Sequence, residues 1–215
     1  MKNIFVIILI SLAPSLMSAQ IGMSLIYQNN HFSDWNLNTP LFQNAGGIGV
    51  DYWFRLKNHR LEIFPGIKYQ HSESNNISGL EGNAIWKKYS FSLKIKAYIF
   101  DFISDCNCPT FSKQNEFFKK GFFVYLDPKF SRHIMYDNSE KEETQIEMNN
   151  VNASGGMGFD FGISNYLTIS PFIGMSLYPN IQWDLLDNNN ESNNDIWGFE
   201  LGVRIGLRWD TQNFY

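Results

Sequence analysis

The chain has few cysteines, no surplus of basic residues and no long apolar run after its first residues. It has two cysteines in 215 residues, and 17 Lys and Arg against 21 Asp and Glu give a formal net charge of −4. This balance argues against nucleic acid as a partner, because phosphate binding draws its affinity from clustered Lys and Arg. Beyond residue 19 no segment reaches the ~18 apolar residues that a membrane helix needs. We therefore expect no nucleic-acid partner and no transmembrane helix.

The first 19 residues differ from the rest of the chain. They contain Lys2, an apolar run over residues 4–12, Pro14 and a small-residue end at Ser18 and Ala19. This is the pattern of a secretory signal peptide. We predict cleavage after Ala19, export, and a mature domain of residues 20–215. The residue directly after the predicted cleavage site is Gln20 and not a cysteine, which excludes a lipoprotein.

Apolar and polar residues alternate along eight segments of the mature chain. In the last one, every second residue from Trp197 to Trp209 is apolar, and the residues between are glycine or charged. A period of two is the signature of a β-strand. The predicted strands cover residues 21–27, 48–56, 61–69, 89–99, 124–134, 151–163, 167–177 and 197–209, with Pro65 interrupting the third.

The connections between these strands alternate between long and short. Residues 28–45 form a long polar loop and residues 57–60 a short turn, as in outer-membrane barrels with short periplasmic turns and long outer loops. The exception is a long periplasmic connection at residues 101–121. A soluble β-sandwich or a lipocalin-like barrel also alternates, but it does not need seven consecutive large apolar residues on its outer face. We therefore predict an all-β fold, an eight-stranded antiparallel up-and-down transmembrane β-barrel.

Several of these features together resemble a known group of proteins. They are the Ala-Gln junction after the leader, the glycine-rich strands, the stretch GGIGVDYWFRLKNHRLEIFPGIKY at residues 46–69, and the aromatic last strand. The chain resembles the small outer-membrane β-barrel proteins of Bacteroidota, including PorT-like proteins, and more distantly the OmpA/OmpX transmembrane barrels. The final QNFY is similar to the signal that the outer-membrane assembly machinery recognises, which implies an assembly role for Trp209, Phe214 and Tyr215.

This resemblance implies a non-enzymatic barrel in the bacterial outer membrane. Its partners would be outer-membrane lipids and lipopolysaccharide, the assembly machinery and an envelope protein. Its role would be that of a structural or accessory subunit of an envelope assembly, such as type IX protein secretion. Two alternatives stay open at this point: a membrane-embedded lipid or peptide hydrolase, and a narrow channel.

The polar face of the strands carries charges of both signs. If the apolar face meets lipid, eight cations and six anions point into the barrel. An eight-stranded barrel is only wide enough for side chains to fill it, and unpaired buried charges are costly. We therefore predict a plugged, structural lumen. The proposed charge network comprises Asp51, Arg55, Lys94, Lys96, Glu200, Arg204 and Arg208, and the wider set adds Glu62, Lys68, Lys88, Asp127, Lys129, Asp160 and Asp210.

The hydrolase alternative depends on a few polar residues. Ser131 and His133 share one face of a predicted strand, above Asp127 and Lys129. Their order reverses the His-x-Ser order of the lipid A deacylases that some outer-membrane barrels resemble, and their face points into the lumen. His31 with Asp34 gives no stronger case. We predict no catalytic residues and no cofactor.

The predicted outer loops are acidic. They contain twelve Asp and Glu residues, and Lys141 is their only Lys or Arg. Carboxylates and amide oxygens suit Ca²⁺, so such loops could share divalent cations with lipopolysaccharide phosphates, although solvated loops explain them as well. The stretch DNNNES lacks the glycine and spacing of an EF-hand loop. We predict no dedicated metal site.

The long connection at residues 101–121 holds both cysteines. Cys106 and Cys108 in an exported protein suggest a small disulfide or a bond to a partner, and two ligands alone make a poor zinc site. A short helix over residues 112–120 would carry aromatic and basic side chains on opposite sides. This segment is either a lid under the barrel or a docking site for a periplasmic partner, and the docking residues would be Phe111, Phe117, Phe118, Lys119 and Lys120.

Overall fold

The described part of the chain is almost entirely β-strand. The computed structural model describes residues 20–32, 43–56, 61–74, 82–99, 121–139, 142–164, 166–182 and 193–208. The strands are β1 (Gln20–Phe32), β2 (Asn44–Tyr52), β3 (Phe54–Leu56), β4 (Leu61–Ser74), β5 (Gly82–Ala97), β6 (Phe122–Ser139), β7 (Glu142–Phe159), β8 (Phe161–Gly162), β9 (Leu167–Gln182) and β10 (Asn193–Arg208). Within these ranges, no helix has the length and apolar character to cross a membrane.

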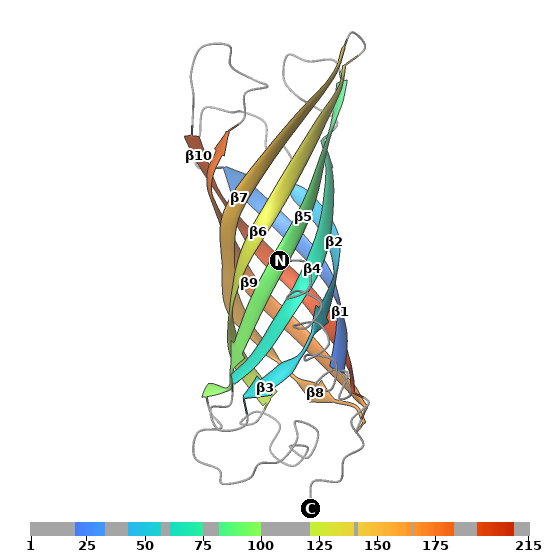
Figure 1. Ribbon diagram of the computed structural model, residues 1–215, viewed down its shortest axis with the longest axis vertical. Coiled ribbons are helices and arrows are strands. Elements are labelled where there is room, and N and C mark those ends of the chain that lie inside the picture. The colour runs from blue at the N-terminus through green and yellow to red at the C-terminus, as the bar shows by residue number, and fades with distance from the viewer. Residues whose placement is uncertain are drawn as a thin grey trace, which may run out of the picture.

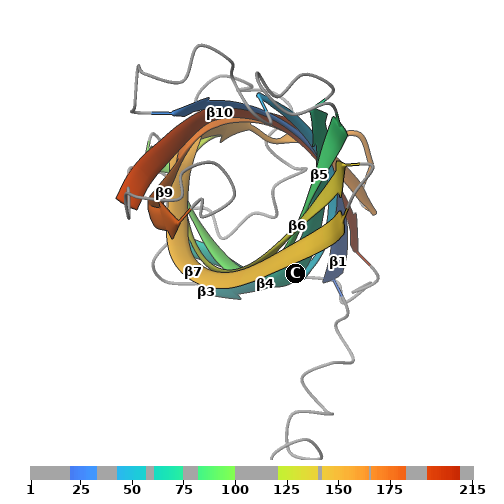
Figure 2. The ribbon, with the colours of Figure 1, turned by 90° about the horizontal axis from the view of Figure 1, so that it is seen from above.

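The strands form one closed antiparallel barrel (Figures 1 and 2). The strands pair in the order β1-β2-β4-β5-β6-β7-β9-β10, with β3 on β4 and β8 on β9, and β10 closes the barrel by pairing with β1. The β1–β10 ladder runs from Gln20 opposite Arg208 to Phe32 opposite Ile196. The short β3 continues β2, and β8 continues β7, so the ten segments make eight barrel strands. The predicted fold, an all-β eight-stranded antiparallel barrel, is confirmed.

Four prolines lie at gaps in the strand ladders, because proline has no N–H to donate. The β4 strand continues through Pro65, which was expected to interrupt it. The interruption falls on the neighbouring strand instead, at Trp53 between β2 and β3. Pro171 lies in the same way beside the position opposite the break at Asp160 between β7 and β8. Pro128 faces a gap in the β5–β6 ladder, and the β7–β9 ladder ends at Leu177, two residues before Pro179.

The outer face of the barrel is an apolar band. Along β10 the outward residues Phe199, Leu201, Val203, Ile205 and Leu207 are all exposed. From Trp197 to Leu207 the strand covers ~33 Å at ~3.3 Å per residue, which is ~25 Å along the barrel axis for a strand tilt of ~40°. An apolar band ~25 Å tall is what outer-membrane barrels present to lipid.

Pairs of aromatic rings mark both ends of this band. Tyr52 and Phe54 pack with ring centroids 4.6 Å apart, and Phe122 and Phe159 with centroids 5.2 Å apart, at the end where the chain enters β1. At the other end Tyr69 packs on Tyr89 at 5.2 Å, and Trp197 on Phe199 at 5.6 Å. Two aromatic belts of this kind are typical of the two membrane interfaces.

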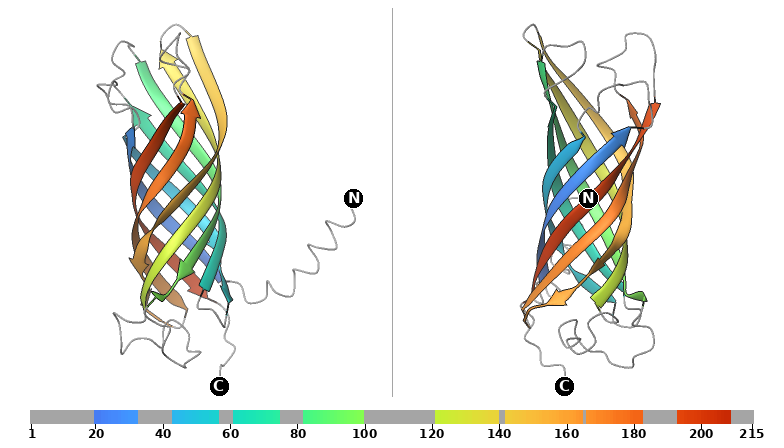
Figure 3. Two further views of the ribbon diagram at one scale, coloured as in Figure 1. Left: turned by 90° about the vertical axis from the view of Figure 1, so that its left-hand side faces the viewer. Right: turned by 180° about the vertical axis from the view of Figure 1, so that it is seen from behind.

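The strands β5, β6 and β7 rise farther at the loop end than β9 and β10 (Figures 1 and 3). The β6 and β7 strands have 18 residues each and pair over their whole length. This corrects the assignment of several acidic residues to loops: Glu73, Asp137, Glu142, Glu143, Glu147 and Asp195 lie in strands. The predicted strands were too short because the outward face of this extension carries polar residues such as Gln145 and Glu147, whereas Trp86 and Met135 turn inward. The apolar-out, polar-in alternation therefore stops there.

Several predictions concern residues outside the described ranges. They are the signal peptide at residues 1–19, the connection at 101–120, Asp34, and the assembly residues Trp209, Phe214 and Tyr215. The same holds for Cys106, Cys108, Phe111, Phe117, Phe118, Lys119 and Lys120. The backbones of Arg55 and Arg208 belong to β3 and β10, but their side chains are not among those described.

Candidate functional site in the barrel interior

A chain of buried charges crosses the middle of the lumen. Asp127 on β6 accepts a hydrogen bond from Lys68 on β4 and lies 3.6 Å from the Nζ of Lys129. Lys129 in turn donates to Glu200 on β10 at 3.1 Å, and Ser176 on β9 donates to the same carboxylate at 2.9 Å. All five side chains are buried. One connected network therefore links four strands on opposite sides of the barrel.

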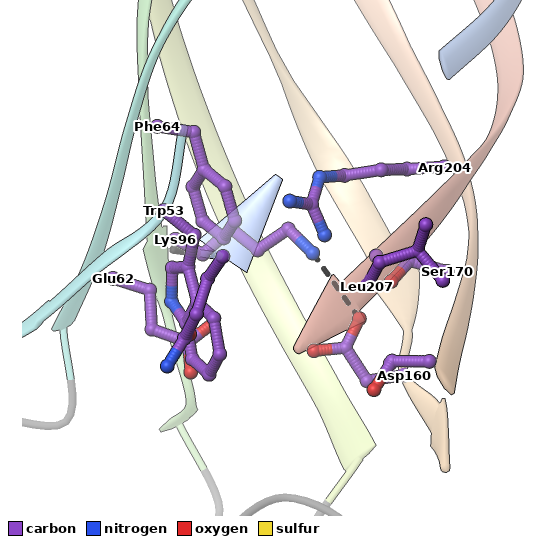
Figure 4. Close-up of a pocket in the computed structure, with 11 residues that line it drawn as sticks. Trp53, Glu62, Phe64, Lys96, Asp160, Ser170, Arg204 and Leu207 are labelled. Carbon is purple, nitrogen blue, oxygen red and sulfur yellow. Dashed lines mark hydrogen bonds and ion pairs between the residues drawn. The ribbon is translucent and has the colours of Figure 1, made fainter. Parts of the chain in front are cut away.

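A second group of charges fills the end of the lumen near Gln20, the first described residue (Figure 4). The guanidinium of Arg204 donates from Nε and Nη2 to Asp51, at 3.0 and 2.6 Å. Lys96 donates to Asp160 at 3.1 Å. The hydroxyl of Tyr98 contacts both Asp160 and Glu62. The break at Asp160 places this carboxylate beside Lys96, and the break at Trp53 places the indole in the same cluster.

Two lysines have no carboxylate partner among the described residues, contrary to the expectation that the interior charges pair with one another. Lys88 donates to the hydroxyl of Tyr178 at 2.6 Å and to the Gln28 Oε1 at 3.4 Å. The Lys94 Nζ lies 4.0 Å from the ring centroid of Phe172 and 4.7 Å from that of Tyr125. The faces of aromatic rings stabilise these cations by cation–π attraction.

Aromatic side chains close the lumen between the two charged groups. Phe123, Tyr125, Phe172 and Tyr98 form one buried cluster with Ile26. Glycines on neighbouring strands give these rings room. A Cβ on Gly174 would lie 2.2 Å from the Tyr125 hydroxyl, and one on Gly202 would lie 2.4 Å from the Phe172 ring. The interior is therefore packed across its width.

The structure places Asp51, Lys94, Lys96, Glu200 and Arg204 inside the barrel. The same holds for the remaining members of the wider set that are described, namely Glu62, Lys68, Lys88, Asp127, Lys129 and Asp160. Sequence reasoning missed the neutral members of the network: Gln28, Gln70, Trp86, Tyr125 and Tyr178. Tyr125 occupies the same alternate positions as the charges, so strand phase would have found it. Gln28, Gln70, Trp86 and Tyr178 lie just beyond the ends of the predicted strands, so strand phase finds them only when the strands are extended to their observed lengths.

The Ser131 and His133 pair lies inside the barrel and is fully buried. Ser131 shares a hydrogen bond with Ser90 at 2.7 Å and accepts one from Asn152 at 2.7 Å. The Nδ1 of His133 accepts a hydrogen bond from the Trp86 indole at 3.1 Å. Each residue is thus engaged with strands other than its own, and neither faces a surface that a lipid could reach. His31 packs against Trp197, with centroids 4.6 Å apart.

We expect Ser131→Ala and His133→Ala to leave the cellular function of the chain intact at matched abundance. Ser131→Ala removes two buried hydrogen bonds and His133→Ala removes one. Each bond is worth about 1 kcal/mol, so these changes affect abundance more than activity. Complementation of a deletion strain, with outer-membrane levels measured in parallel, checks this. Loss of function by both variants at normal abundance would restore the hydrolase alternative.

Within the described ranges, no group of three or more His, Cys, Asp or Glu side chains is arranged to hold a metal ion.

No protein-family model matches the chain, and no curated protein matches it in sequence. Solved structures do match. The attachment invasion locus protein Ail of Yersinia pestis, solved in complex with the heparin analogue sucrose octasulfate, aligns over 89% of this chain and 100% of its own, with 10% identity and a TM-score of 0.52. A major outer membrane protein from Thermus thermophilus aligns over 88% and 99%, with 10% identity and a TM-score of 0.51. The chain therefore has the fold of the small outer-membrane β-barrel proteins.

Proposed function

We propose that the chain is a non-enzymatic, non-conducting β-barrel of the bacterial outer membrane that serves as an accessory subunit of an envelope assembly. The observation that carries this proposal is the lumen, in which buried ion pairs and an aromatic cluster occupy the width of the barrel. Such an interior offers neither a water-filled path nor a substrate pocket. The barrel instead serves to hold the chain in the membrane and to present its ends to other molecules.

The membrane location is supported by the outer face. Large apolar side chains such as Leu25, Ile67, Val151 and Leu177 are more than half exposed, and a soluble protein rarely exposes such a continuous patch. A closed barrel also satisfies every backbone hydrogen bond without water, which a membrane-spanning sheet requires. Barrels of this type belong to outer membranes, and the leader-like residues 1–19 suit export.

The assignment to PorT-like barrels of Bacteroidota and to type IX protein secretion is a narrower proposal. It rests on the sequence resemblance of residues 46–69 and of the last strand. The partner would be an envelope protein that docks on the connection at residues 101–121. The structural likeness to known barrels supports the fold beneath this proposal and says nothing about secretion.

We expect the chain to fractionate with the outer membrane and to migrate faster on a gel before boiling than after it. A closed barrel has no edge strand at which unfolding can begin, so the unheated protein stays compact in detergent. Sucrose-gradient fractionation and paired gel lanes measure both properties. A soluble periplasmic product with no heat-dependent shift would contradict the proposed location.

The accessory role is tested by replacing residues 103–119 with a short Asn-Gly turn, whose type I′ geometry suits the strand twist. We expect a heat-modifiable barrel at near-normal abundance that no longer retains its protein partner in mild-detergent purification. The double variant Cys106→Ser with Cys108→Ser should lose the partner in part if a disulfide shapes the segment. Failure to assemble would make the segment structural, and unchanged partner retention would contradict docking there.

A further inference from the structure

A groove crosses the outer face of the barrel over β2, β4, β5 and β6. Its volume is about 420 Å³, within the range of ~300–1,000 Å³ of ligand pockets. Its floor is formed by Gly49, Lys68 and Ser90, of which Lys68 and Ser90 point their side chains inward. Its walls are outward side chains. Because the groove lies within the apolar band, lipid is the molecule that adjoins it.

Two rows of directly opposite residues form the walls. One row consists of Arg132, Tyr89, Tyr69 and Ile48. The other consists of Phe130, Phe91, Ile67 and Val50. The groove between them therefore follows the cross-strand direction, oblique to the barrel axis. The groove is therefore complementary in shape to an extended, slender ligand.

The chemistry of the first row changes in one direction. With its two flanking strands it reads Asn149, Arg132, Tyr89, Tyr69, Ile48 and Leu25. The β4–β7 strands lean in one direction in Figure 1, so such a row rises from β2 toward β7. The polar end lies toward the loop end of the barrel, and the apolar end lies in the middle of the band. This is the polarity of a lipid whose headgroup is at Arg132.

Arg132 is suited to hold a phosphate at that end. It donates through Nη2 to Glu147, and its side chain is 54% exposed. A guanidinium carries five N–H donors in a planar fork that matches phosphate oxygens, so the pair with Glu147 leaves donors for a second anion. Lys87 lies two residues before Tyr89 on β5 and adds a second cation near this end of the groove. Its Nζ is 4.7 Å from the Tyr136 ring centroid.

The groove end with Arg132 belongs to the outer leaflet. The first and last described residues, Gln20 and Arg208, pair at the opposite end of the barrel, and the termini and short turns of such barrels are periplasmic. We propose that this groove binds one phosphorylated, acylated glycolipid of the outer leaflet, with an acyl chain between the two rows and its phosphate on Arg132. The inference rests on the proposed outer-membrane location.

Native mass spectrometry of the delipidated full chain, titrated with lipid A, phosphatidylglycerol or phosphatidylcholine, tests this site. We expect one tightly held lipid A per barrel and weaker binding of the two phospholipids. Arg132→Gln should weaken lipid A binding about tenfold, since it removes a charge-assisted hydrogen bond. Glu147→Gln should leave binding unchanged or tighten it, because it frees Arg132. Equal losses in these two variants, or phosphatidylglycerol binding as tight as lipid A, would overturn the proposal.

The apolar part of the site has its own variant and control. Ile67→Trp fills the groove and should lower lipid A occupancy about tenfold, whereas Leu201→Trp adds the same ring to the lipid face of β10 and should not. Val50→Phe narrows the groove from the same wall and serves if Ile67→Trp does not fold, as judged by the gel shift. Equal binding by groove and β10 variants overturns the site. If the barrel fractionates with the outer membrane but binds no lipid A, only this inference is contradicted. If the barrel is absent from the outer membrane, the proposed location is contradicted.

Discussion

Glu200→Ala is expected to lower the free energy of unfolding of the barrel by about 3–5 kcal/mol, the usual cost of orphaning a buried charge. The carboxylate of Glu200 lies 3.1 Å from the Lys129 Nζ and accepts a hydrogen bond from Ser176. Without it, Lys129 keeps only the 3.6 Å contact with Asp127. Urea titration in detergent, followed by the heat-dependent gel shift, measures the change.

The control for this variant is Glu73→Ala. Glu73 also has a side-chain partner, the imidazole of His71 at 2.9 Å, but its side chain is 61% exposed, and exposed contacts of this kind contribute at most about 1 kcal/mol. Replacing Glu200 and Lys129 together by Met removes both charges and should recover most of the loss. If Glu200→Ala costs no more than Glu73→Ala, the interior network does not stabilise the barrel.

Gly174→Val is expected to prevent formation of the folded barrel. A Cβ at this position would lie 2.5 Å from the carbonyl oxygen of Gly155 and 2.2 Å from the Tyr125 hydroxyl. The Tyr125 ring cannot move away without losing its contacts in the aromatic cluster. The strand backbone cannot move away without breaking the hydrogen bonds between β7 and β9. We expect no heat-modifiable band for this variant in detergent refolding.

Gly46→Val provides the matched control, because a Cβ on this outward-facing glycine meets nothing within 4 Å. It should fold with the gel shift and urea midpoint of the unmodified chain. If Gly174→Val also folds normally, the lumen is looser than the structure describes. A failure of both variants would instead point to a general intolerance of branched residues at the strand glycines.

The alternation of apolar and polar residues was enough to predict all eight strands, and the outward turn of their apolar face followed from the prediction of a membrane barrel. It works because lipid on one side and a narrow lumen on the other impose a period of two. The inward position of charges such as Asp127 and Glu200 followed directly from strand phase.

What the sequence did not reveal depends on register. The breaks at Trp53 and Asp160 lie one residue away from the positions opposite Pro65 and Pro171 on neighbouring strands, and strand phase says nothing about which residues stand opposite. Strand phase also does not show which interior side chains meet across the lumen. The charges were therefore expected to pair with one another, whereas Lys94 faces the rings of Tyr125 and Phe172.

The packed lumen is the central claim of this account, and conductance in planar bilayers tests it most directly. The purified, refolded chain is inserted at concentrations that give one to many barrels per membrane, with a large porin as the positive control. Ion pairs that join β4, β6 and β10, together with the aromatic cluster beside them, predict no conductance above the bare membrane. Steady, reproducible channel openings from the pure chain would contradict the account.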